Sequence, residues 1–577
     1  MRITDLEIQN FRGIKESNIS FPSDSRIICL IGAGDSTKST LLKAIEWLFW
    51  PTWSLTISDA DFYRDDPTNP IVIRGTFSEF PDKLIAEDKF GMYLRRPCVE
   101  YKENVNDEPL DDKPLCLTIQ LTIDASLDPK WEIVCNRLEP RLITYNDRKQ
   151  LFVGVIGDNT SKDLVWGKYS VLQKYADSKH VLHEAYTAAV REAAKNADLS
   201  ELDKVTATLS DVGRKLGVGF DSEIKNRLLV QGSSFSTTVG LFDGDAPLCQ
   251  FGTGSQRLLS IGLNIGATSG EALLLIDEVE NGLEPFRLRN LINEFRTDHS
   301  TTGQVIMTTH SPVAVSECSI GELMIVHSNA GRTNALIIQT GDKDADNTIQ
   351  RQIRGNAEAY LCKRLIVCEG KTEMGFVRAL DTYLSKTQHR RIAFNGVGTA
   401  DGGGSSIFKC ADIFQKCGYQ ICLLMDSDKE SEDAAKKQIL REQGIYVFNW
   451  AEPNAFEEQV FFDLPLLGVQ EAIEIAVTEK GIESVAAKLQ SNSIPFEQHD
   501  NSIQLYKLNK DQRKTIGTIA KGNGKDKDNG WFKRIGLGEQ LGRIVFKYWD
   551  EISEESILKC EVSQLIDWVM HNDTSRA

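Results

Sequence analysis

This sequence lacks the features that mark several common classes of protein. It has no apolar stretch of about eighteen residues, the length of a membrane span, so we expect no membrane partner. Its 12 cysteines form no CxxC pair and no His/Cys cluster at zinc spacing, which argues against a zinc module. The opening MRITDLEIQNF is not typical of a signal peptide. We therefore expect a cytoplasmic protein with reduced cysteines, most of them small core residues.

Acidic residues outnumber basic ones in the chain as a whole but not in one segment. The net charge is −17, which disfavours nucleic-acid binding by the surface on average. Between residues 507 and 534, however, nine Lys and Arg residues stand against three Asp residues, which leaves a local charge of +6. A charge of this size favours contacts with DNA phosphates. The alternative is a mobile polar loop, because the stretch KGNGKDKDNG is rich in Gly, Asn and Lys.

Residues 26–49 have the pattern of a phosphate-binding loop. An apolar strand leads into GAGDSTKST and then into a helix, and Gly32, Lys38 and Ser39 occupy the positions of the GxxxxGK[ST] pattern. In such loops the backbone N–H groups and the Lys hold phosphates, and the Ser ligates Mg²⁺. Thr37 replaces the second Gly, so we expect nucleotide binding without fast hydrolysis. The predicted nucleotide-binding residues of this loop are Gly32, Gly34, Lys38, Ser39 and Thr40.

Three later segments resemble, in the same order, the motifs of RecF/SMC-type ABC ATPases, whose opening hairpin with an FRG run also has a counterpart here. FGTGSQRLLSIGL resembles the ABC signature, and ALLLIDEVENGLEP resembles the Walker B strand with the D-loop after it. QVIMTTHSP is a further apolar strand that ends at the position of the switch histidine. The resemblance therefore implies an ATPase whose motifs lie on both sides of an insert.

The resemblance also gives a role to each motif. Asp277 is implied to orient Mg²⁺, Glu278 to polarise the attacking water, and His310 to lie beside the γ-phosphate. The signature residues implied to face phosphate are Gly254, Ser255 and Gln256. In ABC ATPases the signature of one subunit completes the nucleotide site of another. Because one chain carries one set of motifs, the resemblance implies at least a homodimer.

The chain is too long for one hydrophobic core, and the motifs suggest how it divides. We expect the first part of the ATPase at 1–165 and its second part, from signature to switch histidine, at 233–350. The insert at 166–232 lacks the sustained heptads of an SMC coiled coil, but HEAYTAAVREAAK has helical spacing. This insert is either a dimerisation module or a plain surface helical pair. Residues 351–577 are expected to form a second enzyme domain with the basic segment near its end.

Two short runs in that last domain have the pattern of buried strands that end in carboxylates. KRLIVCEGKTE places Glu369 after one apolar run, and QICLLMDSDKE places Asp426 and Asp428 after another. Because the carboxyl ends of parallel strands meet at one edge of a sheet, neighbouring strands would bring these acids together. Converging carboxylates repel one another unless a divalent ion such as Mg²⁺ lies between them. The alternative, for either run alone, is a pair of solvated loop acids.

These acids resemble the motif of the Toprim domain, a Glu after one strand and a DxD after a later one. The resemblance implies divalent ions used for phosphodiester chemistry, and it adds Glu373, one helical turn further on, as an acid of the nuclease branch. It also implies a Lys that stabilises charge on the phosphate, for which Lys533 is our prediction and Lys525 the runner-up. Glu457 and Glu458 are left open, because either could join the metal shell or cap a helix. The predicted metal ligands are Glu369, Glu373, Asp426 and Asp428, with Ser39 and Asp277 at the ATPase site.

An ABC ATPase followed directly by Toprim, with no coiled coil, resembles the OLD (overcoming lysogenisation defect) nuclease family. The expected fold class is α/β, an ABC-type ATPase domain with a helical dimerisation insert followed by a parallel-sheet Toprim nuclease domain. The resemblance implies an ATP-regulated DNA endonuclease that uses ATP and Mg²⁺ or Mn²⁺. It also implies antiviral defence, and GAGDSTKST with the compact layout resembles a retron effector, which would have an RNA, DNA or protein partner.

Two other functions fit parts of the sequence. A RecF-like clamp would bind DNA and nucleotide without cutting, but the intact Glu369 and Asp426-Ser427-Asp428 argue against it. A topoisomerase would need a tyrosine in a separate DNA-gate domain, and a primase of this class usually brings a zinc module. Neither feature is visible in the sequence.

Overall fold

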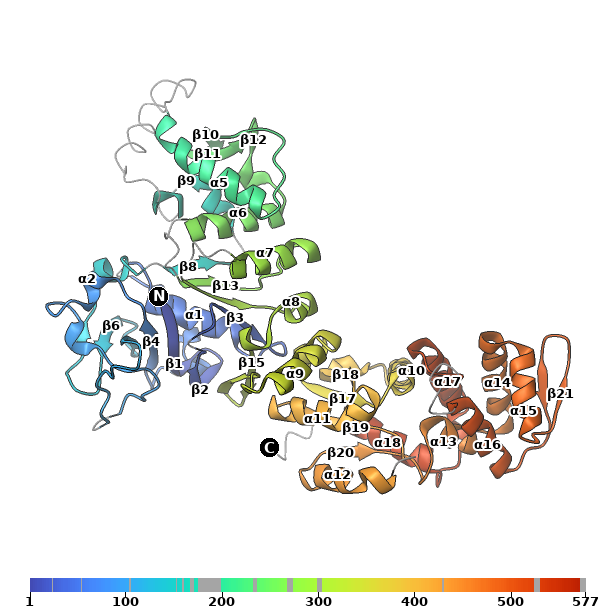
Figure 1. The fold of residues 1–577 in the computed structure, drawn as a ribbon. Coiled ribbons are helices and arrows are strands. Elements are labelled where there is room, and N and C mark those ends of the chain that lie inside the picture. The colour runs from blue at the N-terminus through green and yellow to red at the C-terminus, as the bar shows by residue number, and fades with distance from the viewer. Residues whose placement is uncertain are drawn as a thin grey trace. The chain divides into compact units, whose positions relative to one another are not determined.

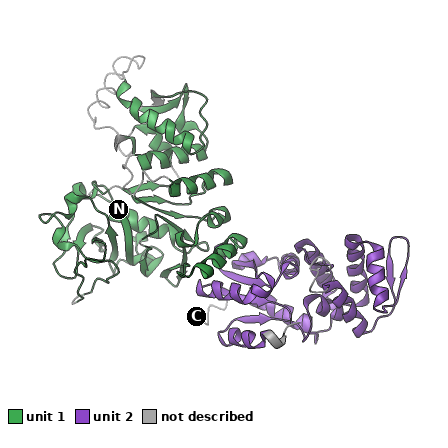
Figure 2. Ribbon diagram, viewed as in Figure 1, with its two compact units in different colours: residues 1–360 green, residues 361–577 purple. Residues whose placement is uncertain are grey.

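The computed structural model divides the chain into two compact units, Met1–Tyr360 and Leu361–Ala577 (Figure 2). The sequence places the corresponding boundary after residue 350. The structure describes all residues except 23, 53, 103–104, 152, 158–159, 167–170, 175–198, 232–235, 267–272, 298–302, 428–429, 523–529 and 571–577. The side chains of 227–231, 236–238 and 430–432 are also outside the description.

The first unit is built on a twelve-stranded sheet with the order β7-β6-β5-β4-β1-β2-β16-β15-β3-β14-β13-β8 (Figure 1). Its parallel part consists of β8 (Val153–Ile156), β13 (Leu273–Ile276), β14 (Gln304–Thr308), β3 (Ile27–Ile31) and β15 (Leu323–Asn329). Every residue of β3 and β13 is buried, as expected for strands covered on both faces. The carboxyl ends of β3, β14 and β13 are neighbours, and they lead into the predicted phosphate loop, into His310 and into the acids Asp277 and Glu278.

The rest of this sheet is antiparallel apart from the β2–β16 pair, and it includes the segment 71–151 whose apolar and polar residues alternate. Its strands are β1 (Arg2–Phe11), β2 (Ile14–Ser20), β4 (Ile71–Ser78), β5 (Cys116–Ile123), β6 (Pro129–Val134), β7 (Arg141–Leu142) and β16 (Arg332–Ile337). The helix α1 (Lys38–Leu48) buries Leu41 and Ile45 in the same apolar core as Ile8 of β1. This packing fixes the helix that begins at the phosphate loop.

A smaller mixed region contains the described part of the predicted insert. The strands β9 (Val165–Trp166), β10 (Ile224–Gln231), β11 (Ser236–Asp243) and β12 (Ala246–Pro247) form a second sheet, and α5 (Asp203–Lys215) packs against α6 (Thr253–Gly266). Within the described part of 166–232, the insert thus contributes one α-helix and strands. The stretch HEAYTAAVREAAK lies outside the described residues. The remaining helices of this unit are α2 (Asp82–Ile85), α3 (Tyr145–Arg148), α7 (Pro285–Thr297), α8 (Pro312–Glu317) and α9 (Lys343–Gly355).

The second unit contains a four-stranded, wholly parallel sheet with the order β18-β17-β19-β20 (Figure 1). Its strands are β17 (Arg364–Cys368), β18 (Val397–Asp401), β19 (Gln420–Leu424) and β20 (Tyr446–Phe448), an arrangement consistent with Toprim. A hairpin of β21 (Phe496–Gln498) and β22 (Ile503–Leu505) follows. The helices are α10 (Lys371–Thr387), α11 (Ile407–Lys416), α12 (Glu430–Glu442), α13 (Phe456–Asp463), α14 (Leu466–Lys480), α15 (Ile482–Ser491), α16 (Lys510–Lys521), α17 (Ile535–Lys547) and α18 (Ile557–Met570). No helix of the described chain has the length and apolar character to cross a membrane.

Glycines allow α17 to lie directly against α10. A Cβ on Gly375 would lie 2.2 Å from the carbonyl oxygen of Ile535, and one on Gly538 would lie 2.4 Å from that of Thr372. Both distances are far below van der Waals contact, so no side chain fits at either position without moving a helix. Thr372 is in the first turn of α10, beside Glu373, so this close packing also positions a predicted site residue.

Replacing Gly538 with Ala should lower the free energy of unfolding by about 1–3 kcal/mol, because the new methyl group overpacks the α10–α17 contact. The matched control is Gly536→Ala in the same helix, where an added Cβ meets nothing within 4 Å. That change should leave stability unaltered or raise it by up to about 1 kcal/mol through helix propensity. Thermal unfolding of the full chain measures both variants. Equal midpoints for the two would contradict the close contact.

Candidate functional site

The phosphate loop follows β3 and closes around its own lysine. Gly32 has φ +138°, and a Cβ there would lie 2.5 Å from the carbonyl oxygen of Val326 in β15, so this position requires glycine. The Nζ of Lys38 donates to the carbonyl oxygens of Gly32 (3.0 Å) and Ala33 (2.8 Å) and to Ser36 Oγ (3.0 Å). Lys38 is only 4% exposed. The ammonium group is therefore held inside the loop that is predicted to receive phosphate.

Nucleotide affinity should fall as the pH rises above 8, because burial lowers the pKa of Lys38 from 10.5 to about 8. The protonated ammonium attracts phosphate, and bound phosphate would raise the same pKa, so binding is coupled to proton uptake on the alkaline side. We expect a loss of about tenfold in affinity between pH 7 and pH 9. Titration of a fluorescent nucleotide at several pH values measures this effect. Lys38→Arg, whose charge does not change in this range, should show no such slope, and a flat profile in the unaltered protein would contradict the prediction.

Thr37 occupies a backbone conformation that explains why the pattern normally has glycine. Its φ of 68° and ψ of 13° are left-handed, and a β-branched residue there carries strain of about 1–2 kcal/mol. The Oγ1 of Thr37 lies 2.9 Å from Oγ1 of Thr333, a buried residue of β16. This hydroxyl contact ties the loop to the sheet. Gly34 is at the exposed part of the loop, and Thr40 lies in the first turn of α1.

The two residues predicted to ligate Mg²⁺ at the ATPase site lie together. Ser39 Oγ donates to Asp277 Oδ1 at 2.9 Å, and Thr308 Oγ1 donates to the same oxygen at 2.6 Å. Glu278 follows with φ 48°, a strained conformation for a residue other than glycine, and its N–H donates to Thr308 Oγ1. A hydroxyl and a carboxylate oxygen are ligands that Mg²⁺ accepts, so the donor set fits this ion.

The predicted signature residues make hydrogen bonds within their own segment and to the next helix. Gln256 Nε2 donates to the carbonyl oxygens of Cys249 and Phe251, and Ser255 Oγ accepts from Arg287 of α7. Gly254 leaves room for the D-loop, because a Cβ there would lie 2.2 Å from the carbonyl oxygen of Gly282. Their role toward phosphate stays a prediction.

Two residues that the sequence analysis missed organise the Walker B turn. Arg257, buried in α6, donates to the backbone carbonyl oxygens of Asp277 and Glu278 and so joins the signature helix to these acids. Glu280 accepts from the N–H of the exposed His310 and from Thr309 Oγ1, both at 2.6 Å. The sequence signal for Arg257 was that it is the one charged residue of FGTGSQRLLSIGL.

In the second unit, Glu369 and Asp426 lie side by side where β17 and β19 end. The two strands pair in parallel, and the backbone N–H of Asp426 donates to Glu369 Oε2 at 2.9 Å. The N–H of Glu369 in turn donates to the carbonyl oxygen of Leu424 at 2.9 Å. Asp426 Oδ1 accepts from the N–H of Phe456 at 2.7 Å, which connects it to the start of α13. Asp428 lies outside the described residues.

Glu373 lies in the first turn of α10 and is 4% exposed. Its Oε2 accepts from the N–H of Gly370 at 2.9 Å. Burial raises the pKa of Glu373 to about 7, with a further contribution from the negative charge of Glu457. Glu373 and Glu457 therefore create a negative electrostatic potential in a buried site with little water. A cation is attracted most strongly in such a site.

The structure separates the roles of the two adjacent acids Glu457 and Glu458. Glu458 caps α13, since its Oε2 accepts from the N–H of Ala455 at 2.8 Å. Glu457 is fully buried and points to the other side, where its Oε1 accepts from Lys533 Nζ at 2.7 Å. Burial by itself would lower the pKa of Lys533, but Glu457, with Glu373 and Asp426 behind it, raises that pKa above its usual value. The runner-up Lys525 lies outside the described residues.

The carboxylates fit a divalent cation by their chemistry. All the donors are oxygens, as Mg²⁺ and Mn²⁺ prefer, and Glu457 Oε2 is buried without a hydrogen-bond partner. A buried carboxylate oxygen in this state needs a proton or a cation. Within the described residues, no three His, Cys, Asp or Glu side chains converge closely enough to hold an ion as they stand. Glu369, Asp426, Glu373 and Glu457 are thus neighbours around one edge of the sheet rather than a closed ligand set.

The basic segment 507–534 is partly engaged inside the second unit. Its described basic residues with acidic or carbonyl partners are Lys533 on Glu457, Lys521 on Glu458, Arg534 on Glu479 and Arg513 on the carbonyl oxygen of Leu464. These contacts neutralise or hold part of the local charge of +6 within the unit, so fewer of the basic side chains are available to DNA. DNA binding by this segment stays a prediction.

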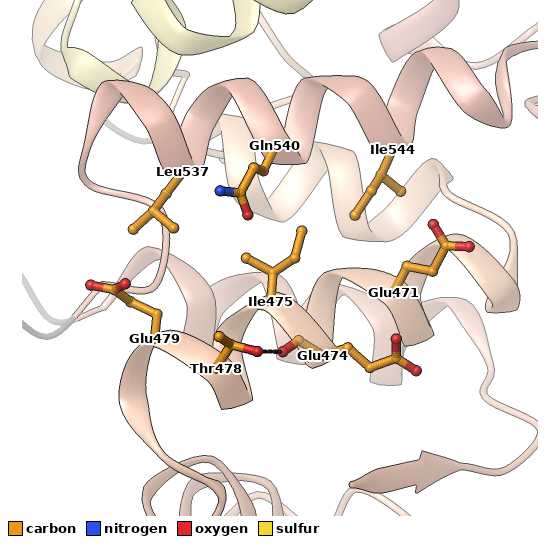
Figure 3. Close-up of a pocket in the computed structure, with 8 residues that line it drawn as sticks. All are labelled: Glu471, Glu474, Ile475, Thr478, Glu479, Leu537, Gln540 and Ile544. Atoms are coloured by element: carbon orange, nitrogen blue, oxygen red, sulfur yellow. Dashed lines mark hydrogen bonds between the residues drawn. The ribbon is translucent and has the colours of Figure 1, made fainter.

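A groove of about 440 Å³ lies between α14 and α17 (Figure 3). Ile475, Leu537 and Ile544 supply its apolar surface. Of its acidic residues, Glu471 accepts from Lys547 and Glu479 pairs with Arg534. None of the predicted site residues lines it, so the groove is separate from the carboxylate site.

Comparison with known proteins adds to this geometry. The family described as "AAA domain, putative AbiEii toxin, Type IV TA system" matches residues 27–316. The chain is similar to the Old nuclease of Escherichia phage P2, with 21% identity over 472 residues that cover 74% of this chain and 77% of that protein. The Smc head domain with an extended coiled coil, bound to the C-terminal domain of ScpA from Pyrococcus furiosus, has a TM-score of 0.37 at 14% identity and covers 61% of this chain and 99% of that chain. The SMC head domain from Thermotoga maritima has a TM-score of 0.31 at 13% identity, covering 59% and 100%.

Proposed function

Since the chain belongs to the AAA-domain family described as putative AbiEii toxin, Type IV TA system, we propose that its ATPase controls a metal-dependent DNA endonuclease in the second unit. The observation that carries the proposal is that Glu369 and Asp426 adjoin where two parallel strands end, with the ion pair of the buried Glu457 and Lys533 close to Asp426. The relative from phage P2 is named a nuclease, which supports the same reaction class.

The carboxylates would hold one or two divalent ions. Glu369, Asp426, Glu373 and Glu457 are the described candidates, and Asp428 is proposed with them from the sequence. When bound, such ions neutralise charge on the phosphate and activate water for in-line attack. The buried position of Glu373 and Glu457 keeps water away from the charged groups and so strengthens their attraction for cations. Lys533 brings a positive charge to the same place and is proposed to stabilise the phosphate as its charge develops.

The ATPase is proposed to work as at least a dimer. Lys38, Ser39 and Asp277 form one half of a nucleotide site, while the signature at the start of α6 is proposed to face the nucleotide of a second copy. The N-terminus of α6 is proposed to present backbone N–H groups to phosphate, as helix N-termini do. Nucleotide occupancy would then set access to the second unit, with hydrolysis slowed by Thr37.

Antiviral defence is the proposed role of this activity. The family description names a putative toxin, and the relative from phage P2 is named Old nuclease, the family that the sequence resembles. Placement with the retron effectors stays a prediction from the loop sequence and layout. Plating phage on cells that carry the gene, with Asp426→Asn as control, tests the role.

A cleavage assay tests the reaction itself. Supercoiled, linear and single-stranded DNA are incubated with the full chain, with Mg²⁺ or Mn²⁺ and ATP varied independently. Metal-dependent nicking or cutting is the expected result. Nucleotide binding without any cleavage under all these conditions would favour the DNA-binding clamp.

A further inference from the structure

Lys533 has a firmly held backbone and a side chain with a path to solvent. The two residues before it, Trp531 and Phe532, are fully buried, and the carbonyl oxygen of Phe532 accepts from Thr372 Oγ1 at 3.1 Å. Gly530 makes room for the stem, because a Cβ there would lie 2.6 Å from Lys533 Cγ. The Lys533 side chain is nevertheless 37% exposed. Its ammonium can therefore leave the site without any change in the backbone that carries it.

Glu457 has a buried carboxylate oxygen that needs a proton or a cation. It is fully buried, its Oε1 accepts from Lys533 Nζ at 2.7 Å, and its Oε2 has no hydrogen-bond partner. One ammonium group satisfies one of the two oxygens. A divalent ion could bind both oxygens and would also be attracted by the neighbouring Glu373. In this structure the charge of Glu457 is thus neutralised by the monovalent ammonium of Lys533, which binds a carboxylate less strongly than a divalent ion would.

We propose that Lys533 competes with the divalent metal for Glu457, and that metal binding displaces the ammonium toward solvent and the DNA phosphate. The inference rests on the proposed metal site and deepens it. In the metal-free protein, Lys533 then takes the place of the metal: its ammonium pairs with the buried Glu457 and so stabilises the fold. Once displaced, the same group is a partner for phosphate, so loading of metal and readiness for substrate are linked through one side chain.

The competition predicts that substitutions of Lys533 and of Glu457 change the affinity for Mn²⁺ in opposite directions. Lys533→Met should bind Mn²⁺ at least about fivefold more tightly than the unaltered chain, although it loses a charge proposed to assist cleavage. Glu457→Gln should bind Mn²⁺ more weakly. A residue that only stabilises the site would weaken metal binding when removed, so the sign of the change separates the two roles.

The matched control is Lys521→Met. Lys521 pairs with Glu458, the neighbour of Glu457 that caps α13, at 3.6 Å. Removing this lysine takes away the same charge close to the site but frees no inward-facing carboxylate. A change below about twofold is expected, which corrects for the general electrostatic effect. Lys533→Gln is a second test variant that keeps a hydrogen-bond donor if the Met variant fails to fold.

The experiment measures Mn²⁺ binding to the full chain by electron paramagnetic resonance without DNA or nucleotide. The binding component that disappears in Asp426→Asn is taken as that of the second unit. A rise in Lys533→Met or Lys533→Gln well beyond that in Lys521→Met, with a fall in Glu457→Gln, supports the competition. Equal affinities in the two lysine variants, or no effect of Glu457→Gln, overturn it while leaving the metal site in place. If no variant and no unaltered chain binds Mn²⁺ in this component, the proposed metal site itself fails.

Discussion

Replacing Asp426 with Asn should reduce DNA cleavage by at least about a hundredfold and leave nucleotide binding unchanged. The substitution removes a negative charge from the edge of the sheet where Glu369 and Asp426 meet. It keeps the local fold, because an Asn side-chain oxygen can still accept the hydrogen bond from the N–H of Phe456 that Asp426 Oδ1 accepts at 2.7 Å. Plasmid nicking at saturating Mg²⁺ measures the effect, and a fluorescent nucleotide measures binding.

The matched control for this prediction is Asp412→Asn. Asp412 is an exposed acid of the same unit that pairs with Lys416 one helical turn away. Such surface pairs contribute little, so cleavage should stay within about twofold of the unaltered chain. If Asp426→Asn cleaves as fast as Asp412→Asn, the reaction does not occur at this site. A cleavage rate that recovers at high Mn²⁺ would instead show that the substitution weakens metal binding alone.

The strands that carry the site could be predicted from the sequence because their apolar runs are continuous. The runs before Glu369 and Asp426 form β17 and β19, which are neighbours in a parallel sheet as the Toprim resemblance implies. The loop around Lys38 and the strand before Asp277 could be predicted for the same reason, since each motif combines a buried run with a specific polar end. Local sequence contains both parts of these signals.

Side-chain contacts that depend on tertiary packing could not be predicted from the sequence. Glu457 and Glu458 are adjacent on one helix, and only the way α13 packs against α16 decides which of them faces the acids. Arg257 and Glu280 act through backbone atoms of distant residues, so no side-chain pattern reveals them. The insert was expected to be helical, and its described part contains α5 together with β10, which pairs with β11.

Replacing Glu278 with Gln should reduce ATP hydrolysis by about 10²- to 10⁴-fold while nucleotide binding persists. Glu278 is held at φ 48° by the hydrogen bond from its N–H to Thr308 Oγ1 and by Arg257, which donates to its carbonyl oxygen. These contacts use only the backbone of Glu278, so Gln can replace the side chain without loss of the fold, and the predicted role of the carboxylate toward the attacking water can be tested by itself. Phosphate release measures the rate.

The same variant shows how nucleotide controls assembly and cleavage. If the signature of one copy closes on the nucleotide of another, blocked hydrolysis should make the nucleotide-bound dimer accumulate, which size measurement with and without ATP detects. Glu284→Gln is the control, because Glu284 is an exposed acid that pairs with Arg287 at 3.2 Å just after the D-loop. Hydrolysis in Glu278→Gln at the rate of Glu284→Gln would remove Glu278 from the reaction. If the dimer accumulates and DNA cleavage rises, bound ATP is the activating state, whereas a fall in cleavage makes hydrolysis the step that releases the nuclease.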